Sequence, residues 1–144
     1  MTYCIFCDIL SGIASAKFVY RDDICSAFMD IHPVNPGHVL VVPHSHCALI
    51  SELDETSVGH MFHVAQKVDV ALRASGIKCE AINLFLADGR SAGQEVMHVH
   101  LHVIPRFHGD GHHLRFNPSY FKLPSSAELD KNAEMIRNQL GDIP

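Results

Sequence analysis

The chain has 144 residues, 47% of them hydrophobic and 19% charged, which fits a single globular domain over residues 1–144. Eleven Lys and Arg against sixteen Asp and Glu give a net charge of -5 with neutral His, and the basic residues are scattered. This argues against a basic surface for nucleic acid but leaves local binding of a nucleotide open. Because no apolar run approaches the ~18 residues of a membrane span and the N-terminus lacks a signal-peptide pattern, we expect a cytoplasmic protein without membrane contact.

Cysteine and histidine are the informative residue types. The five Cys are odd in number and widely spaced, which argues against a disulfide framework and favours reduced thiols or a metal site. Of the twelve His, six lie between His98 and His113. Histidine chemistry is therefore the first place to look for a function.

The first part of the chain predicts strands. Residues 17–30 indicate two short strands around a polar Arg-Asp-Asp turn. Residues 32–37 contain two Pro and one Gly, which disfavour regular structure. Residues 38–42 are rich in β-branched side chains and nearly continuous in apolarity, as in a buried strand that stops at Pro43.

The pattern changes to helical between residues 56 and 75, where apolar residues recur on one stripe. Asp54 or Thr56 is expected to cap this helix at its N-terminus, and Gly76 is expected to end it.

Two further strands are expected over residues 81–87 and 96–104, the second closed by Pro105. Residues 108–124 are irregular in pattern, and residues 125–128 form a capping box before a short terminal helix. Together these elements predict an α+β fold, with an antiparallel sheet of about five strands, one central helix and a short C-terminal helix.

Three imidazoles lie two residues apart in the strand expected over 96–104, at His98, His100 and His102. Because side chains alternate between the faces of a strand, the three rings share one side at steps of roughly 6–7 Å, and the apolar residues between them face the core.

Three interpretations fit this pattern. One is a chance set of surface histidines on an edge strand. Another is a catalytic zinc site with an open coordination position, although no carboxylate follows directly after His102. The third is nucleophilic catalysis, in which one neutral imidazole attacks phosphorus while its neighbours donate to the phosphate oxygens and the leaving group. The loop from Gly89 to Gln94 favours the third, because its backbone N–H groups and Arg90 suit an anion.

The sequence His-Val-His-Leu-His-Val-Ile over residues 98–104 resembles the signature of the histidine-triad (HIT) nucleotide hydrolases and transferases. The resemblance covers most of the chain and agrees in order and spacing at residues 4–9, 28–33, 36–43 and 89–106. It implies a HIT-like fold. The third triad position is His rather than Gln, so the chain resembles the hydrolase branches and not the hexose-1-phosphate uridylyltransferase branch.

The resemblance implies a role for each polar residue of the site. His100 corresponds to the nucleophile that accepts the nucleoside monophosphate, and His102 to a donor to the α-phosphate. His98 would orient the nucleophile through its backbone carbonyl and lie near the leaving group. Asp30 corresponds to the residue that binds the ribose hydroxyls, and His38 to a histidine behind the triad that completes its hydrogen-bond network.

Apolar residues near both signatures are candidates for a purine pocket, with ordinary core packing as the alternative; they are Ile5, Phe6, Ile9, Phe28 and Ile31. The loop before the triad supplies Gly93, Gln94 and Glu95 as candidate substrate contacts. Two positions depart from the family pattern. Ala87 stands where Asn or Gln is usual near the phosphate, and Glu95 stands where the phosphoramidase branch has Ser. A carboxylate beside phosphate is expected to slow anionic substrates.

The CxxC pair at the N-terminus is compatible by itself with a redox pair, two buried thiols or half of a metal site. Bacterial-type family members that this sequence resembles combine such a pair with two histidines, which implies one structural Zn²⁺. The ligands would be Cys4, Cys7, His46 and His98. His44 and Cys47 are the nearest rivals.

The resemblance therefore implies an enzyme that hydrolyses a nucleoside phosphoramidate or a dinucleoside polyphosphate at the α-phosphorus. It would proceed through a covalent nucleotidyl-histidine, release a nucleoside monophosphate and need no organic cofactor. The family also implies a homodimer with the sheets joined across the interface. The alternatives are a purine nucleotide-binding regulatory module with little catalysis and a metal-dependent hydrolase that uses the triad as ligands.

Overall fold

The computed structural model describes residues 3–141 and divides the chain into two compact units, residues 1–112 and 113–144. The sequence predicts one domain over the whole chain. All five strands and the candidate site residues belong to the first unit.

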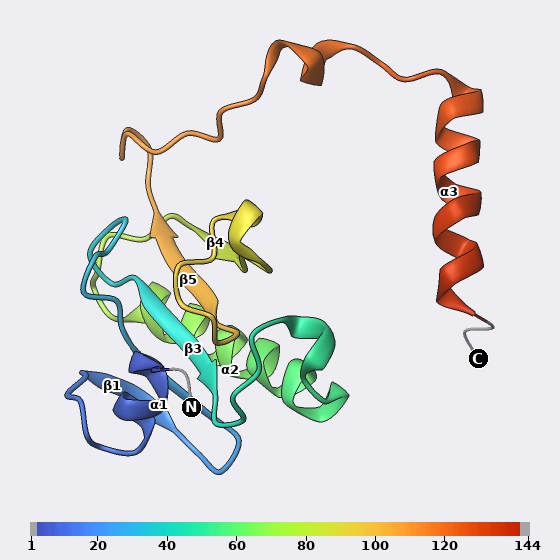
Figure 1. The fold of residues 1–144 in the computed structure, drawn as a ribbon. Helices are drawn as coiled ribbons and strands as arrows, with labels where there is room; N and C mark the ends of the chain where they lie inside the picture. The colour runs from blue at the N-terminus through green and yellow to red at the C-terminus, as the bar shows by residue number, and fades with distance from the viewer. Residues whose placement is uncertain (1–2, 142–144) are drawn as a thin grey trace. The chain divides into compact units, whose positions relative to one another are not determined.

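The first unit is built on one antiparallel sheet of five strands, as the sequence predicts (Figure 1). The strands lie in the order β1-β2-β3-β5-β4. Their bounds are Phe18–Arg21 for β1, Cys25–Met29 for β2, Val39–Pro43 for β3, Ala81–Phe85 for β4 and Leu101–Arg106 for β5.

One face of the sheet is covered by α2, which spans Glu55–Ala74. Asp54 caps it, because its carboxylate accepts a hydrogen bond from the Ser57 amide at 2.9 Å. The apolar stripe of α2 is buried against the central strands and forms the larger core of the molecule, which includes Met61, Val64, Val41 and Leu101. The predicted helix and one of its two candidate caps are confirmed.

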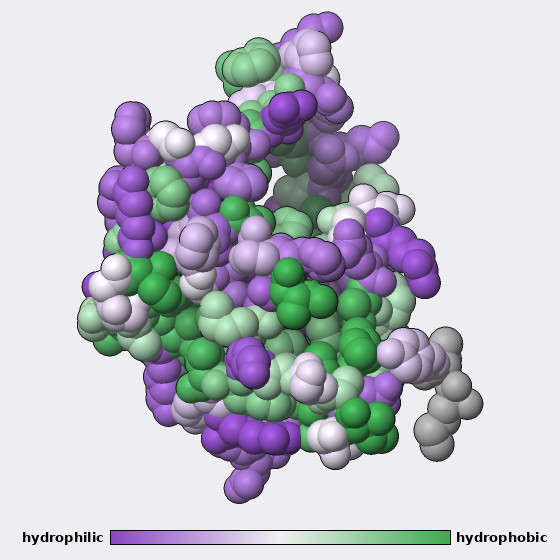
Figure 2. Space-filling model, turned by 90° about the vertical axis from the view of Figure 1, so that its left-hand side faces the viewer, coloured by the Kyte–Doolittle hydropathy of each residue, from purple (hydrophilic) through white to green (hydrophobic). Residues whose placement is uncertain are grey.

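The opposite face carries a smaller apolar cluster that includes α1, a helix over Ile5–Leu10 that the sequence analysis did not identify. Phe6 packs edge-on against Phe28 of β2, with ring centroids 5.7 Å apart. Figure 2 looks onto the side where α1 and β1 lie in Figure 1 and shows apolar side chains gathered there. A short helix thus closes one end of the face that carries the histidines.

β5 begins and ends later than the sequence predicts. It starts at Leu101 and not at residue 96, and it continues through Pro105 to Arg106. Proline is tolerated because β3 pairs with β5 only as far as Val103, so beyond that residue β5 has β4 as its one strand partner. His98 and His100 therefore lie on the segment that enters the strand, and His102 lies within it.

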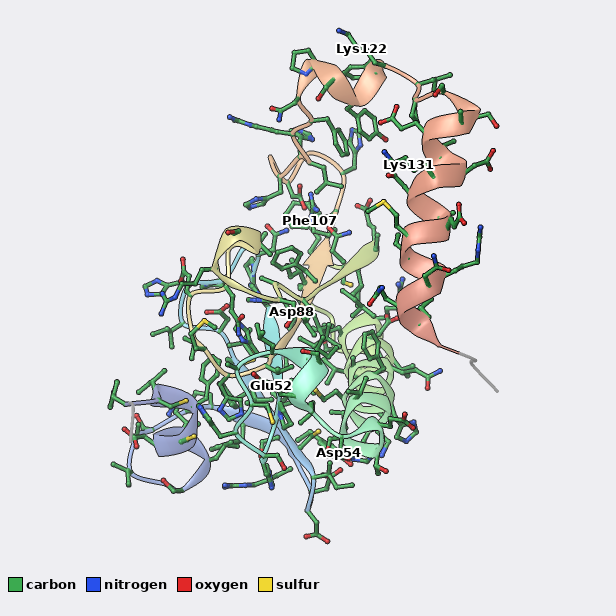
Figure 3. All side chains as sticks on the ribbon, turned by 45° about the vertical axis from the view of Figure 1, so that its right-hand side comes forward. Glu52, Asp54, Asp88, Phe107, Lys122 and Lys131 are labelled. Carbon is green, nitrogen blue, oxygen red and sulfur yellow. The ribbon has the colours of Figure 1, made fainter. Side chains whose placement is uncertain are left out.

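The connection between β3 and α2 is held by two carboxylates. Glu52 accepts from the amides of Ala48 and Leu49, and Asp88 accepts from the amide of Ile50 at 2.8 Å. Both acids are labelled in Figure 3, beside the turn at the start of α2. The Glu52 bonds lie within the loop after β3, and the Asp88 bond joins this loop to the loop after β4.

The second unit contains a 3-10 turn over Pro118–Phe121 and the predicted terminal helix, α3, over Ser126–Leu140. Ser125 caps α3 by accepting from the Glu128 amide at 3.2 Å. None of the residues of α3 is buried. Among residues 3–141, no helix combines the length and apolarity needed to cross a bilayer.

Candidate active site

A cavity of about 510 Å³ opens on the α1 side of the sheet. One part is apolar and one part carries the polar groups. The apolar lining includes Ile5, Phe6, Ile9, Phe28, Ile31 and Leu40, and the polar lining includes Asp30, His32, His38, Glu95, His100 and His102. All five candidate purine-pocket residues and most candidate polar residues are thus brought together around one cavity.

The strand register explains how this lining is assembled. Phe28, Leu40, His102 and Phe85 are direct cross-strand partners on four neighbouring strands, so their side chains share one face. Phe85 also packs on the His102 ring at a centroid distance of 5.6 Å. Sequence reasoning missed Phe85, although its alternation along β4 and the pairing of β4 with β5 indicate this position.

His100 presents one free ring nitrogen to the cavity. Its Nδ1 lies 2.7 Å from the carbonyl oxygen of His98, which only an Nδ1–H can satisfy. The neutral ring therefore carries its lone pair on Nε2. Burial lowers the pKa of His100, an effect that the bond to His98 and the charges of Asp30 and Glu95 oppose in part. The ring is held neutral, in the tautomer of a nucleophile.

His102 has the opposite tautomer, and His38 determines it. The amide of Val34 donates to Nδ1 of His38 at 3.0 Å, so the His38 proton lies on Nε2. That nitrogen lies 2.8 Å from Nδ1 of His102, which must accept. A neutral His102 consequently carries its proton on Nε2, where it is available as a donor. Burial lowers the pKa of His102 to about 4, and His100 and His38 add to the shift.

Asp30 lies at the edge of this histidine network. Its Oδ1 accepts from the His32 amide at 2.8 Å, while Oδ2 lies 3.5 Å from Nε2 of His38 and 3.9 Å from Nδ1 of His102. Burial lowers the pKa of His38 despite the opposing charge of Asp30. Oδ2 is left as a charged acceptor that lines the cavity.

His98 is fully buried and both of its ring nitrogens are committed. Nε2–H donates to the carbonyl of Pro43 at 2.9 Å, and Nδ1 faces a cluster of Cys4, Cys7 and His46. The carbonyl contact with His100 is where the resemblance places it. Because no ring nitrogen is left and His98 does not line the cavity, the structure does not support the expected position near the leaving group.

The Cys and His donors are spaced as a tetrahedral metal site requires. Nδ1 of His98 lies 3.4 Å from Sγ of Cys4, 3.7 Å from Sγ of Cys7 and 3.3 Å from Nδ1 of His46. Zinc bonds of about 2.0–2.1 Å to nitrogen and about 2.3 Å to sulfur place tetrahedral ligand atoms about 3.3–3.8 Å apart. The donor set and its spacing therefore fit Zn²⁺. The rivals lie elsewhere: His44 bonds Ser26, and the Cys47 thiol faces the Glu52 carbonyl.

Gln94 supports the loop and does not line the cavity. Its Oε1 accepts from the Gly89 amide at 2.7 Å, and its Nε2 donates to the carbonyls of Ala48 and Val96 at 2.8 and 3.0 Å. The amide of Gly93 donates to the Arg90 carbonyl at 2.9 Å, within a 3-10 turn over Arg90–Ala92. The expected phosphate donors at Gly93 and Gln94 are thus used inside the loop, whereas Glu95 and Gly93 still reach the cavity.

A polar anchor that sequence reasoning missed holds the turn between Asp30 and His38. The Asn35 side chain is buried and donates to the Pro105 carbonyl and to Asp110, both at 2.9 Å. Arg106 binds the same carboxylate through Nε at 2.5 Å. Asn35 lies 70 residues from Pro105 and 75 residues from Asp110 in the sequence, so no local pattern indicates these hydrogen bonds.

Comparisons with known proteins find relatives that cover most of the chain. The HIT domain family matches residues 12–109. An uncharacterized HIT-like protein of Methanocaldococcus jannaschii is 42% identical over 113 residues, which are 78% of this chain and 86% of that protein. Adenylylsulfatase HINT3 of Arabidopsis thaliana is 32% identical over 142 residues, 98% of this chain and 71% of that protein. The crystal structure of a Zn-bound histidine triad family protein from Mycobacterium smegmatis has a TM-score of 0.74 and 38% identity, over 80% of this chain and 83% of that one.

Proposed function

We propose a function from the premise that the chain belongs to the HIT family: it hydrolyses nucleoside phosphoramidates or dinucleoside polyphosphates at the α-phosphorus and releases a nucleoside monophosphate. One observation carries the proposal. Two neutral imidazoles of opposite tautomer line the same cavity, His100 with a free Nε2 lone pair and His102 with a free Nε2–H. The pair supplies a nucleophile and a hydrogen-bond donor to one phosphoryl group.

The cavity orients a purine nucleotide from its apolar end to its histidine end. The base would lie among Phe6, Phe28 and Ile31, and the free oxygen of Asp30 would accept from the ribose hydroxyls. These two contacts place the 5′-phosphate beside His100. Binding far from the reacting atom thus holds phosphorus in line with the nucleophile.

The chemistry would proceed in two displacements. Nε2 of His100 forms a bond to the α-phosphorus as the bond to the leaving group breaks, and His102 donates to a phosphoryl oxygen on which charge develops. The leaving group takes up a proton from solvent as it departs. Water then attacks the nucleotidyl-histidine: its hydroxyl stays on phosphorus, its proton returns to solvent, and the P–N bond to His100 breaks so that Nε2 regains its lone pair. Removal of a single donor of the His102 type typically costs about 10²–10³ in rate.

Zinc would have a structural role. Cys4, Cys7, His46 and His98 would hold one Zn²⁺, which would crosslink the N-terminal segment to the segment that enters β5. Since the carbonyl of His98 orients His100, this crosslink fixes the nucleophile without a contact to substrate.

Trapping the intermediate tests the enzymatic function. The wild-type chain is mixed with adenosine 5′-phosphoramidate or diadenosine tetraphosphate, quenched without acid and measured by intact mass. We expect a transient adduct of one adenosine monophosphate that maps to His100 and is absent in His100→Ala. Unaltered turnover in His100→Ala, or net inversion at a chiral α-phosphorus, would show direct attack by water. Tight nucleotide binding without any turnover would favour the binding module. A second Zn per chain that is lost together with turnover in His102→Ala would favour the metal-dependent alternative, because His102 is not a ligand of the structural site.

Metal analysis tests the zinc site. Protein purified without chelator should contain one Zn per chain, and Cys4→Ser should lower both the zinc content and the melting temperature. Cys79→Ser is the matched control, because Cys79 lies outside the cluster. Equal zinc content in both variants would refute the assignment. The proposed homodimer is tested separately by sedimentation, and a monomer at all concentrations would contradict it.

A further inference from the structure

Among residues 3–141, the lining of the cavity includes two carboxylates and no lysine or arginine side chain. Asp30 and Glu95 are the acidic members among the described lining residues. Asp30 is engaged with the His32 amide and faces His38, as described above. The histidine network operates with neutral rings, because His38 and His102 each accept a hydrogen bond through Nδ1. The cavity is therefore negative before a substrate enters.

Glu95 is the lining carboxylate that has no observed ion-pair or hydrogen-bond partner among residues 3–141. Within residues 3–141 its side chain forms none of the observed ion pairs, and none of the observed side-chain hydrogen bonds includes it. Arg90, the nearest basic residue in the sequence, forms no ion pair with it. The Glu95 side chain is exposed and lines the cavity, so its carboxylate faces whatever molecule occupies that cavity.

The backbone around Glu95 is held in place. The preceding residue, Gln94, is buried and uses its side chain to bind the amide of Gly89 and the carbonyls of Ala48 and Val96. Val96 packs on the cluster that contains Phe6. The two neighbours of Glu95 are thus fixed while its own side chain faces the cavity. A charge on a fixed backbone can discriminate between substrates, because it cannot be relieved by a local shift of the loop.

We propose that Glu95 selects substrates by the charge of the leaving group, in favour of nucleoside 5′-phosphoramidates whose amine carries a cationic tail and against polyphosphate leaving groups. The α-phosphate already brings one negative charge into a negative cavity. An anionic leaving group adds repulsion with Glu95, whereas an ammonium group on the tail is attracted to it. Glu95 is on this account a specificity-determining residue, and the inference rests on the proposed function.

The overall reaction balances with one water. The P–N bond of the phosphoramidate breaks, the hydroxyl of water ends on phosphorus, and its hydrogen ends on the departing amine. The products are a nucleoside monophosphate and a free amine. No oxidant, reductant or second substrate is needed.

A matched series of three substrates tests the proposal. Each is adenosine monophosphate joined through a P–N bond to a three-carbon amine: 1,3-diaminopropane with a cationic tail, propylamine with a neutral tail and β-alanine with an anionic tail. For the wild type we expect kcat/KM to fall in that order, with about a tenfold span between the ends. Raising the ionic strength should narrow the span.

Variants isolate the contribution of Glu95 from the intrinsic reactivity of the amines, because each substrate is compared across proteins. The span in kcat/KM across the three substrates should shrink to about twofold in Glu95→Gln. In Glu95→Lys the order of the substrates should reverse. Glu55→Gln is the control, since Glu55 begins α2 on the opposite face of the sheet, and it should keep the wild-type order. Melting temperatures of the variants check that each is folded.

The outcomes separate the two proposals. If the wild type releases adenosine monophosphate from the series and the span in kcat/KM is the same in Glu95→Gln as in the wild type, the charge selection by Glu95 is refuted and the proposed function stands. If no member of the series and no dinucleoside polyphosphate is hydrolysed, the proposed function fails and this inference fails with it.

Discussion

The two faces of the sheet are built by different means. The core under α2 is apolar, and Met61, Val64 and Leu101 are almost completely buried there. The opposite face has a small apolar cluster around Phe6 and, beside it, buried histidines joined by hydrogen bonds. The α2 face stabilises the fold by removing apolar surface from water. The opposite face buries histidine rings, and each buried ring needs hydrogen-bond partners that set its tautomer.

This difference shows how the fold separates stability from chemistry. On the α2 face an apolar side chain of suitable volume can take the place of another, because dispersion and burial have no direction. On the histidine face each ring nitrogen needs one particular partner, such as the carbonyl of Pro43 or the amide of Val34. Changes on the first face should therefore alter stability, and changes on the second should alter binding and rate.

The largest expected effect is on the apolar face. Met61→Ala removes a buried side chain from the α2 core and should lower the free energy of unfolding by about 2–5 kcal/mol, measured by denaturant titration. The adjacent Phe62 is 46% exposed, so Phe62→Ala should cost far less. The kcat/KM of the folded fraction should be unaltered in both. A lower kcat/KM in Met61→Ala without a loss of stability would contradict the assignment of stability to the α2 face and of chemistry to the histidine face.

On the histidine face, Asp30→Ala removes the proposed acceptor of the ribose hydroxyls. It should weaken binding of adenosine monophosphate by about 1.5–3 kcal/mol, which is about 10- to 150-fold in Kd by calorimetry. The matched ligand is 2′,3′-dideoxyadenosine monophosphate, which lacks both hydroxyls. It should bind wild type and variant with similar affinity, and an equal loss for both ligands would place the ribose elsewhere.

The pH dependence of the rate sharpens the same comparison. His102 must be neutral to accept from His38 and donate to phosphate, and burial lowers its pKa to about 4. After correction for uncatalysed hydrolysis, kcat/KM should stay level from pH 7 to about pH 5 and decline as the pH approaches 4. A decline centred on the ordinary histidine pKa of ~6.5 would contradict the burial of this ring.

The smallest effect is expected at the anchor of the Asp30–His38 turn. Hydrogen bonds from Arg106 hold the pKa of Asp110 below its usual range. The stability this gives is complete above the unfolded-state pKa of ~3.9 and is lost as the pH falls through the lower folded-state pKa. Unfolding followed from pH 6 to pH 2 should show a weaker acid dependence in Asp110→Asn than in the wild type. Parallel curves would show that the bond contributes nothing to acid stability.

The apolar face and the strands could be read from the sequence. Continuous apolarity over residues 38–42 and the helical stripe after Asp54 predict buried elements, and both are found. The helix α1 escaped because six residues give too little periodicity. The end of β5 was misplaced because a proline is a poor stop signal where the neighbouring strand has already ended.

The candidate site was predictable in its residue types but not in its hydrogen bonding. The alternation of His98, His100 and His102 indicates a shared face, and the structure brings His100 and His102 to one cavity. Whether a ring nitrogen is free depends on Pro43 and Val34, which the triad pattern does not contain. For this reason the leaving-group position expected for His98 has no support.

His98 also shows how a side chain that never meets the substrate can be among the least replaceable in a sequence. One nitrogen belongs to the cluster with Cys4, the other to the Pro43 carbonyl, and its own carbonyl holds the nucleophile. An amide or thiol side chain satisfies one of these requirements and fails another. In a library of random substitutions, fewer side chains at position 98 than at position 95 should retain activity. This is expected although Glu95 faces the cavity and His98 is buried and does not line it.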